Sequence, residues 1–321
     1  MNVSLVGIGA GLVSALLVAV VAKATPLALL LFLLAPIPVL IVTLGWDHRA
    51  GLVACLTGGI ATALVLSPLD GLGFAAGTGL PAWWLGYLAL LGQPRADGAI
   101  AWYPLGHLLA WIAATAALAW LATAIMGSGS FEAFEQRMRR LAELALRAQL
   151  PVVAGTIESP GVEPFIKRMV AVVPGIAGIG STLILAFYLW AGAKIAAVSG
   201  RLARPWPYIP GAIMPRPALG MLLGSIALSY LGGFIQVFAV ALFGAVSMAF
   251  GLQGLAALHQ LVARRRPAPA LLTATYLLLV LSQGLLLLPF ILFGMVDTAI
   301  GIRSRMKLPP APIAGGPTTR T

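Results

Sequence analysis

Long apolar stretches dominate the chain, and short groups of charged residues or prolines separate each stretch from the next. About nine such stretches fit into the 321 residues. Each is close to the roughly 20 apolar residues that a helix needs to cross about 30 Å of hydrocarbon. The pattern therefore predicts an all-α, polytopic transmembrane bundle of eight to nine helices. The lower number applies if one of the stretches interrupted by Gly or Pro is re-entrant.

These stretches divide the chain into four segments. We expect an N-terminal transmembrane bundle of five spans in residues 1–126, an amphipathic helix and a loop in residues 127–168, a C-terminal bundle of about four spans in residues 169–308, and a disordered tail rich in Pro, Gly and Thr in residues 309–321. Residues 218–263 contain no Asp, Glu, Lys or Arg and are too long for one span. They predict two spans with a turn at Gly232-Gly233. Residues 270–300 predict the last span.

The segment between the two bundles is the most highly charged part of the chain. Its apolar residues recur every three or four positions, which predicts an amphipathic helix with Ser130 as its N-cap. They are Phe131, Phe134, Met138, Leu141, Ala145 and Ala148. We favour a helix that lies on the membrane surface. A face that docks a partner protein remains the alternative.

Composition supports membrane insertion. Sixty per cent of the residues are hydrophobic and nine per cent are charged, whereas about a quarter are charged in soluble domains. The net charge of +11 comes from short basic clusters at the ends of apolar stretches, where they suit anionic lipid headgroups. We expect the lipid bilayer as a partner and no nucleic acid. The single cysteine, Cys55, cannot form an internal disulfide.

Basic residues also bear on orientation. Nine alternating spans place the two termini on opposite faces of the membrane. Counting Lys and Arg on each face then favours a cytoplasmic C-terminus, with the central helix on the same side.

Catalytic and metal-binding motifs are missing from the sequence. We find no HExxH, no phosphate-binding loop and no paired acids on one helical face, and the three histidines are scattered. We therefore expect no enzyme activity, no metal and no cofactor, and a membrane-embedded enzyme is the least favoured of the functional hypotheses.

Polar residues inside the spans are the remaining candidates for a site, because they are costly in hydrocarbon. Gln236, Ser247 and Gln253 belong to one apolar stretch, and we expect them on one face of its helix. We favour hydrogen bonds that join neighbouring helices. Contact with a small ligand is the alternative. Asp297 is the only acid in the last stretch and precedes Arg303 by six residues. It is either an interfacial cap or a substrate site.

Small residues predict where helices approach closely. Gly7/Gly11, Gly73/Gly77 and Gly220/Gly224 form GxxxG pairs. The glycines of residues 71–79 precede Pro81 and predict a partly broken helix.

Two regions resemble a known family. In the first half they are residues 35–38 (Ala-Pro-Ile-Pro) and 79–82 (Gly-Leu-Pro-Ala); in the second they are residues 253–259, followed by the Arg264–Arg266 triplet, and residues 294–297. These short motifs are similar to those of the YybS-like predicted membrane proteins of bacteria, a family of unknown function. The resemblance implies a bacterial inner-membrane location.

That family is itself distantly similar to the substrate-binding membrane subunits of energy-coupling-factor vitamin transporters. This similarity implies a small-molecule pocket among the helices and a separate energising partner. The chain departs from those subunits, which have about six helices, in its larger number of spans and its charged central helix. No vitamin-binding residue can be carried over.

Two functional hypotheses follow. The first is a transporter-like protein without its own ATPase, whose ligand site within the bundle uses Gln236, Ser247, Gln253 and Asp297. The second is a non-transport scaffold that recruits cytoplasmic partners through the central amphipathic helix.

Overall fold

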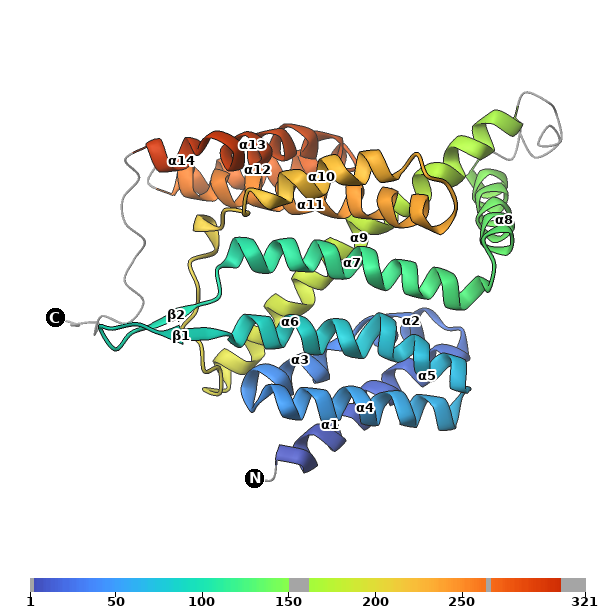
Figure 1. Ribbon diagram of the computed structural model, residues 1–321, viewed down its shortest axis with the longest axis horizontal. Helices are drawn as coiled ribbons and strands as arrows, with labels where there is room; N and C mark the ends of the chain where they lie inside the picture. The colour runs from blue at the N-terminus through green and yellow to red at the C-terminus, as the bar shows by residue number, and fades with distance from the viewer. Residues whose placement is uncertain (1–2, 150–161, 264–266, 307–321) are drawn as a thin grey trace.

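A computed structural model describes residues 3–149, 162–263 and 267–306, and its long helices run side by side in one bundle (Figure 1). Within these residues, six helical segments are long and apolar enough to cross a membrane. They are Val3–Lys23, Pro26–Gly45, His48–Val65, Leu105–Ser128, Glu163–Val198 and Gly233–Val262. Several shorter apolar helices accompany them. The prediction of an all-α membrane bundle is confirmed.

The first half of the chain crosses the bundle back and forth and ends with helix α7. Its elements are α1 (Val3–Ala19), η1 (Val20–Lys23), α2 (Pro26–Leu33), α3 (Pro36–Gly45), α4 (His48–Val65), α5 (Pro68–Phe74), η2 (Ala75–Gly79), α6 (Leu80–Leu90), β1 (Gly92–Pro94), β2 (Ile100–Trp102) and α7 (Leu105–Ser128). The strands form a small antiparallel hairpin in a loop where no strand was predicted.

The second half begins with the charged central helix. Its elements are α8 (Phe131–Gln149), α9 (Glu163–Val198), η4 (Ile209–Gly211), α10 (Pro217–Leu228), α11 (Gly233–Val262), α12 (Ala268–Leu281), η5 (Leu285–Leu287), α13 (Leu288–Ile300) and α14 (Ile302–Arg305). Residues 163–168, expected in the loop before the C-terminal bundle, belong to α9.

The bundle has two distinct ends (Figure 1). One end carries the β1–β2 hairpin and α14, and we call it the hairpin end. The other carries α8, which lies across the ends of the long helices, and we call it the α8 end.

Glycine breaks the second half at two turns. The predicted turn at Gly232-Gly233 is confirmed, because both residues have positive φ angles, of 73° and 60°. The last predicted span is wrong as a single helix. Gln283 (φ 50°) and Gly284 (φ 86°) reverse the chain, and the stretch becomes two short helices, α12 and α13.

The turn at Gln283-Gly284 determines at which end of the bundle the last described helix lies. Because α13 returns to the hairpin end, α14 lies at the same end as the start of α1 and opposite α8 (Figure 1). Nine alternating spans would have brought the last helix to the side of α8, whereas the described chain finishes at the opposite end; the C-terminus itself, in residues 307–321, lies outside the described residues.

The glycine-rich stretch before Pro81 is distorted but stays helical. Residues Ala75–Gly79 form one π-helical turn between α5 and α6, so the predicted irregularity is present. Pro81 has no N–H to donate, and a widened turn is a common way to accommodate such a defect inside a helix.

Helix α8 is amphipathic as predicted, but its buried stripe is shifted. The backbone N–H of Ala133 donates to Ser130 Oγ at 3.2 Å, which confirms the N-cap. Residues every four positions face the bundle, namely Phe134, Met138, Ala142 and Leu146, whereas Leu141 and Ala145 are exposed. The side chain of Ala148 lies outside the described part.

Helix α11 lies at the centre of the bundle and packs through small residues against α7, α9, α10 and α13. A Cβ on Gly244 would overlap the backbone of Gly175 in α9, and one on Gly254 would overlap Phe290 in α13. Of the three predicted GxxxG pairs, Gly7/Gly11 lies at such a contact, between α1 and α4. A Cβ added to Gly73, Gly220 or Gly224 would meet no neighbouring atom within 4 Å, and one added to Gly77 would make only ordinary contact.

We predict that Gly244→Ala lowers the free energy of unfolding by about 1–3 kcal/mol, since the added methyl group must push α9 and α11 apart. Gly220→Ala is the matched control, because open space surrounds that position. Unfolding by titration with a denaturing detergent measures the free energy of unfolding of both variants. Equal stability of the two variants would contradict the close α9–α11 packing.

Candidate functional site

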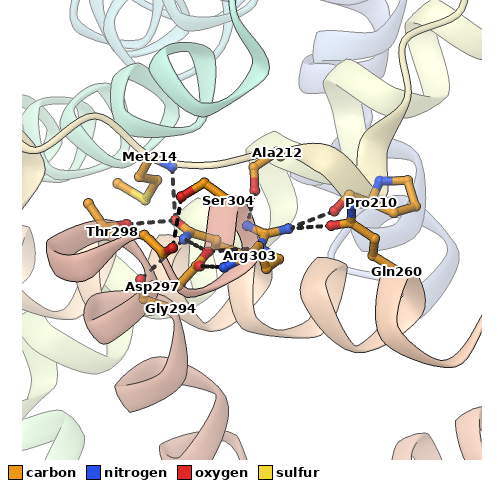
Figure 2. Close-up of polar contacts among 11 residues, drawn as sticks. Pro210, Ala212, Met214, Gln260, Gly294, Asp297, Thr298, Arg303 and Ser304 are labelled. Atoms are coloured by element: carbon orange, nitrogen blue, oxygen red, sulfur yellow. Dashed lines mark hydrogen bonds and ion pairs between the residues drawn. The ribbon is translucent and has the colours of Figure 1, made fainter. Parts of the chain in front are cut away.

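A buried polar network, drawn in Figure 2, joins α11, α13 and α14. It lies near the hairpin end, where Figure 1 places α14. Asp297 is its centre. Its Oδ2 accepts from Arg303 Nε at 2.8 Å and from Gln253 Nε2 at 3.1 Å, and its Oδ1 accepts the backbone N–H of Arg303 at 2.9 Å. The side chains of Asp297 and Arg303 are 0% and 2% exposed. A charged pair is therefore held inside an otherwise apolar bundle.

The network also holds the proline-rich loop that follows α9. Arg303 donates from Nη1 to the carbonyl of Pro210 (2.8 Å) and to Gln260 Oε1 (3.2 Å), and from Nη2 to the carbonyl of Ala212 (2.6 Å). Gln253 Oε1 accepts the backbone N–H of Met214 at 2.9 Å. These bonds give partners to backbone groups that no helix satisfies, which is required where such a loop enters the bundle.

The remaining capacity of Gln253 is also used. Its Oε1 accepts from Thr298 Oγ1 at 3.2 Å, and its Nε2 donates to the carbonyl of Gly294 at 3.1 Å. The donors and acceptors of the Gln253 carboxamide are therefore all hydrogen-bonded to neighbouring segments. This arrangement matches the interpretation that polar residues join helices.

The four sequence-predicted ligand residues are not gathered in one place. Gln253 and Asp297 bind each other. Gln236 lines a separate cleft at the α8 end, beside α8 and α9. Ser247 is buried in α11. The expectation of one shared face was wrong in its geometry, because at 100° per residue Gln253 lies about 100° around the helix from Gln236.

A large apolar cavity lies elsewhere in the bundle, between α7, α9, α11 and α12. Its volume is about 680 Å³, within the roughly 300–1,000 Å³ of small-molecule sites. None of the four predicted residues lines it. The wall is made largely of Leu, Ile, Ala and Met, including Ile112 of α7, Leu183 and Ala186 of α9, and Met248 and Ala256 of α11. The sequence gives no sign of this cavity, because apolar lining residues look the same as packed core residues.

The polar part of the cavity wall is at the hairpin end. Arg204 and Trp206 come from the proline-rich loop, and His259 and Tyr276 come from α11 and α12. Arg204 Nη1 donates to the carbonyl of Ala89 at 3.1 Å. Burial lowers the pKa of Arg204, although a guanidinium remains protonated in proteins.

The network and the cavity are connected through this loop. Arg303 holds the carbonyls of Pro210 and Ala212, and the same loop supplies Arg204 and Trp206 to the cavity a few residues earlier. The buried ion pair therefore positions the polar end of the cavity.

A family model for a predicted membrane protein (DUF2232) matches residues 12–298. The chain belongs to this family. The DUF2232 match covers the cavity-lining helices and includes Gln253 and Asp297. No curated protein and no solved structure matches the chain significantly.

Removal of one charge from the network should lower the stability of this DUF2232 protein. We predict that Asp297→Asn lowers the free energy of unfolding by about 3 kcal/mol, because it leaves the buried Arg303 without a counter-ion. Detergent-titrated unfolding measures the loss. The double variant Asp297→Asn with Arg303→Gln should lose less than the sum of the two single variants.

Asp97→Asn is the control for this test. Asp97 is an exposed acid in the hairpin turn, and it accepts a hydrogen bond from the backbone N–H of Ala99. Its substitution should change the free energy of unfolding by no more than about 0.5 kcal/mol. Full stability of Asp297→Asn would show that the buried pair does not hold the fold together.

Proposed function

We propose that this protein is the membrane-embedded, ligand-binding part of a transport system, with its site in the apolar cavity and no ATPase of its own. The observation that supports the proposal is the apolar, partly open cavity of about 680 Å³ among the helices. Its volume falls in the range of small-molecule sites, and its lining is mostly apolar with a few polar groups, as in such sites. A cavity of this size is therefore a candidate binding site.

The route into the cavity would run from the lipid. Of the lining residues, Leu183 and Trp190 of α9 and Val280 of α12 remain exposed, so the cavity opens sideways between these two helices. Helix α12 has no buried residue. It is the least tightly held wall of the cavity and the natural element to move when a ligand enters.

The scaffold hypothesis has weaker support. The α8 stripe that would be offered to a partner is occupied by the protein itself: Phe134 and Met138 pack against Ala124 of α7 and Val237 of α11. Arg139 pairs with Glu163 of α9 at 2.5 Å, which further fixes α8 to the bundle. The exposed Leu141 and Leu144 are suited to the lipid interface.

Orientation forms part of the proposal. The Arg264–Arg266 triplet follows α11 in the sequence, and Lys307 and Arg320 follow α14. Since α11 and α14 both end at the hairpin end (Figure 1), the positive-inside rule favours a cytoplasmic hairpin end. Helix α8 would then face away from the cytoplasm, which is a second argument against recruitment of cytoplasmic partners. The resemblance to the YybS-like proteins extends the proposal to the inner membrane of a bacterium.

Filling the cavity tests ligand binding. We predict that the wild-type protein, purified in mild detergent, carries apolar small molecules detectable by mass spectrometry, and that Ala186→Trp and Ala256→Trp lose them, because each indole would occupy the cavity. Ala227→Trp is the control, since Ala227 of α10 is exposed away from the cavity. Gel filtration verifies folding. Unchanged contents in both cavity variants would contradict the proposal.

Cysteine labelling tests the orientation. In a Cys55→Ala background, Arg140→Cys on α8 should react with a membrane-impermeant maleimide in intact cells, whereas Asp97→Cys in the hairpin should react only after permeabilisation. The opposite pattern would reverse the orientation. Labelling of both positions from one side would contradict the fold, because the two residues lie at opposite ends of the bundle.

A further inference from the structure

We propose that the cavity binds a single-chain amphiphile with an acidic head, of the fatty-acid class, whose carboxylate pairs with Arg204 while its alkyl chain lies among α7, α9, α11 and α12. This inference rests on the proposed ligand-binding function and specifies its substrate class.

The charge of the cavity wall is the first argument. Arg204 is the single charged side chain among the described residues that line the cavity, and none of these residues is an Asp or Glu. Within the described chain, its hydrogen-bond partner is the neutral carbonyl of Ala89, bound by Nη1. A half-buried guanidinium that has donors to spare and no acidic partner in the described chain favours an anionic group, for which its forked geometry is well suited.

Within the described residues, two other arginines near the hairpin end have a carboxylate or an aromatic ring as partner, in contrast to Arg204. Arg303 is paired with Asp297, and Arg201 lies over the ring of Trp46, 4.3 Å from its centroid. Arg204 has neither kind of partner among the described residues. A second cation reinforces the positive potential there, since Lys194 Nζ lies 5.1 Å from the ring centroid of Trp206, a lining residue.

The shape of the cavity is the second argument. Its lining residues on α9 extend from Ile179 to Ala193, which at 1.5 Å per residue is about 21 Å along the helix axis. The cavity is therefore long and apolar, with its cation at one end. A volume of about 680 Å³ suits one alkyl chain better than the two chains of a phospholipid.

The position of the opening agrees with such a ligand. A fatty acid in a bilayer keeps its carboxylate at headgroup level and its chain among the lipid tails. It could pass between α9 and α12 with its chain still in apolar surroundings, and its carboxylate would meet Arg204 in the interfacial loop at the hairpin end.

Binding of radiolabelled palmitate and hexadecanol to the purified full chain in phosphatidylcholine nanodiscs tests the inference. These probes share one chain and differ in the acidic head. We expect palmitate to bind about tenfold to hundredfold more tightly than hexadecanol, because a hydrogen-bonded charge contact of this kind is worth about 1.5–3 kcal/mol and 1.4 kcal/mol is tenfold. Arg204→Gln should abolish the difference, because palmitate binding weakens by that factor while hexadecanol, which carries no charge, loses much less.

Two variants act as controls. Arg204→Lys should keep part of the preference for palmitate, because the charge is retained. Arg201→Gln, a change of the same kind three residues earlier in the same loop, should leave palmitate binding unchanged. Inorganic phosphate, added as an anion without a chain, should not displace palmitate at millimolar concentration.

The outcomes separate the two proposals. Equal binding of palmitate and hexadecanol, unaffected by Arg204→Gln but lost in Ala256→Trp, would overturn the acidic-head inference and leave the apolar ligand site standing. Displacement of palmitate by phosphate would overturn it in favour of an ion site. Failure of both probes to bind, with co-purifying molecules unchanged in Ala256→Trp, would overturn both proposals.

Discussion

The hydrogen-bonded ion pair between Asp297 and Arg303 is the interaction on which the second half of this protein depends. Within an apolar bundle neither charge is tolerable alone. Together they can be buried because Gln253 and the backbone of the loop after α9 supply the remaining partners. The pair thus fixes three segments at once: α11, the α13–α14 corner and the proline-rich loop.

This arrangement explains how an irregular loop can enter the bundle. Five prolines between residues 205 and 217 exclude a regular helix and remove backbone donors, but the carbonyls still need partners. Arg303, with several donors on one rigid fork, satisfies two of them. The loop is held in one place as a result, and it presents Arg204 and Trp206 to the cavity. The side chain of Arg303 therefore links the stability of the fold to the position of the proposed binding site.

Packing elsewhere in the bundle contrasts with the cavity. Around α11, glycines bring backbones into direct contact, as Gly244 does with α9 and Gly254 with α13. Helix α12 has no buried residue. The cavity lies on the side of the bundle where this close packing stops, between α9 and α12. The proposed ligand site thus lies beside the least buried helix, whereas glycine contacts join α11 closely to α9 and α13.

The sequence by itself determined the class of fold, the helix-forming stretches, the amphipathic α8 with its Ser130 cap, and the turn at Gly232-Gly233. These features follow from local rules: apolar length, periodicity and glycine conformation. It also indicated that polar residues such as Gln253 join helices, because polar groups in hydrocarbon need partners.

Only the tertiary structure decided the rest. The turn at Gln283-Gly284 is hidden in an apolar stretch, yet it reverses α13 and places α14 opposite α8. The pairing of Gln253 with Asp297 joins residues 44 positions apart, which no local pattern specifies. The cavity was invisible for a related reason: an apolar side chain looks the same in sequence whether it faces the core, the lipid or an empty space, and only the arrangement of the helices distinguishes them.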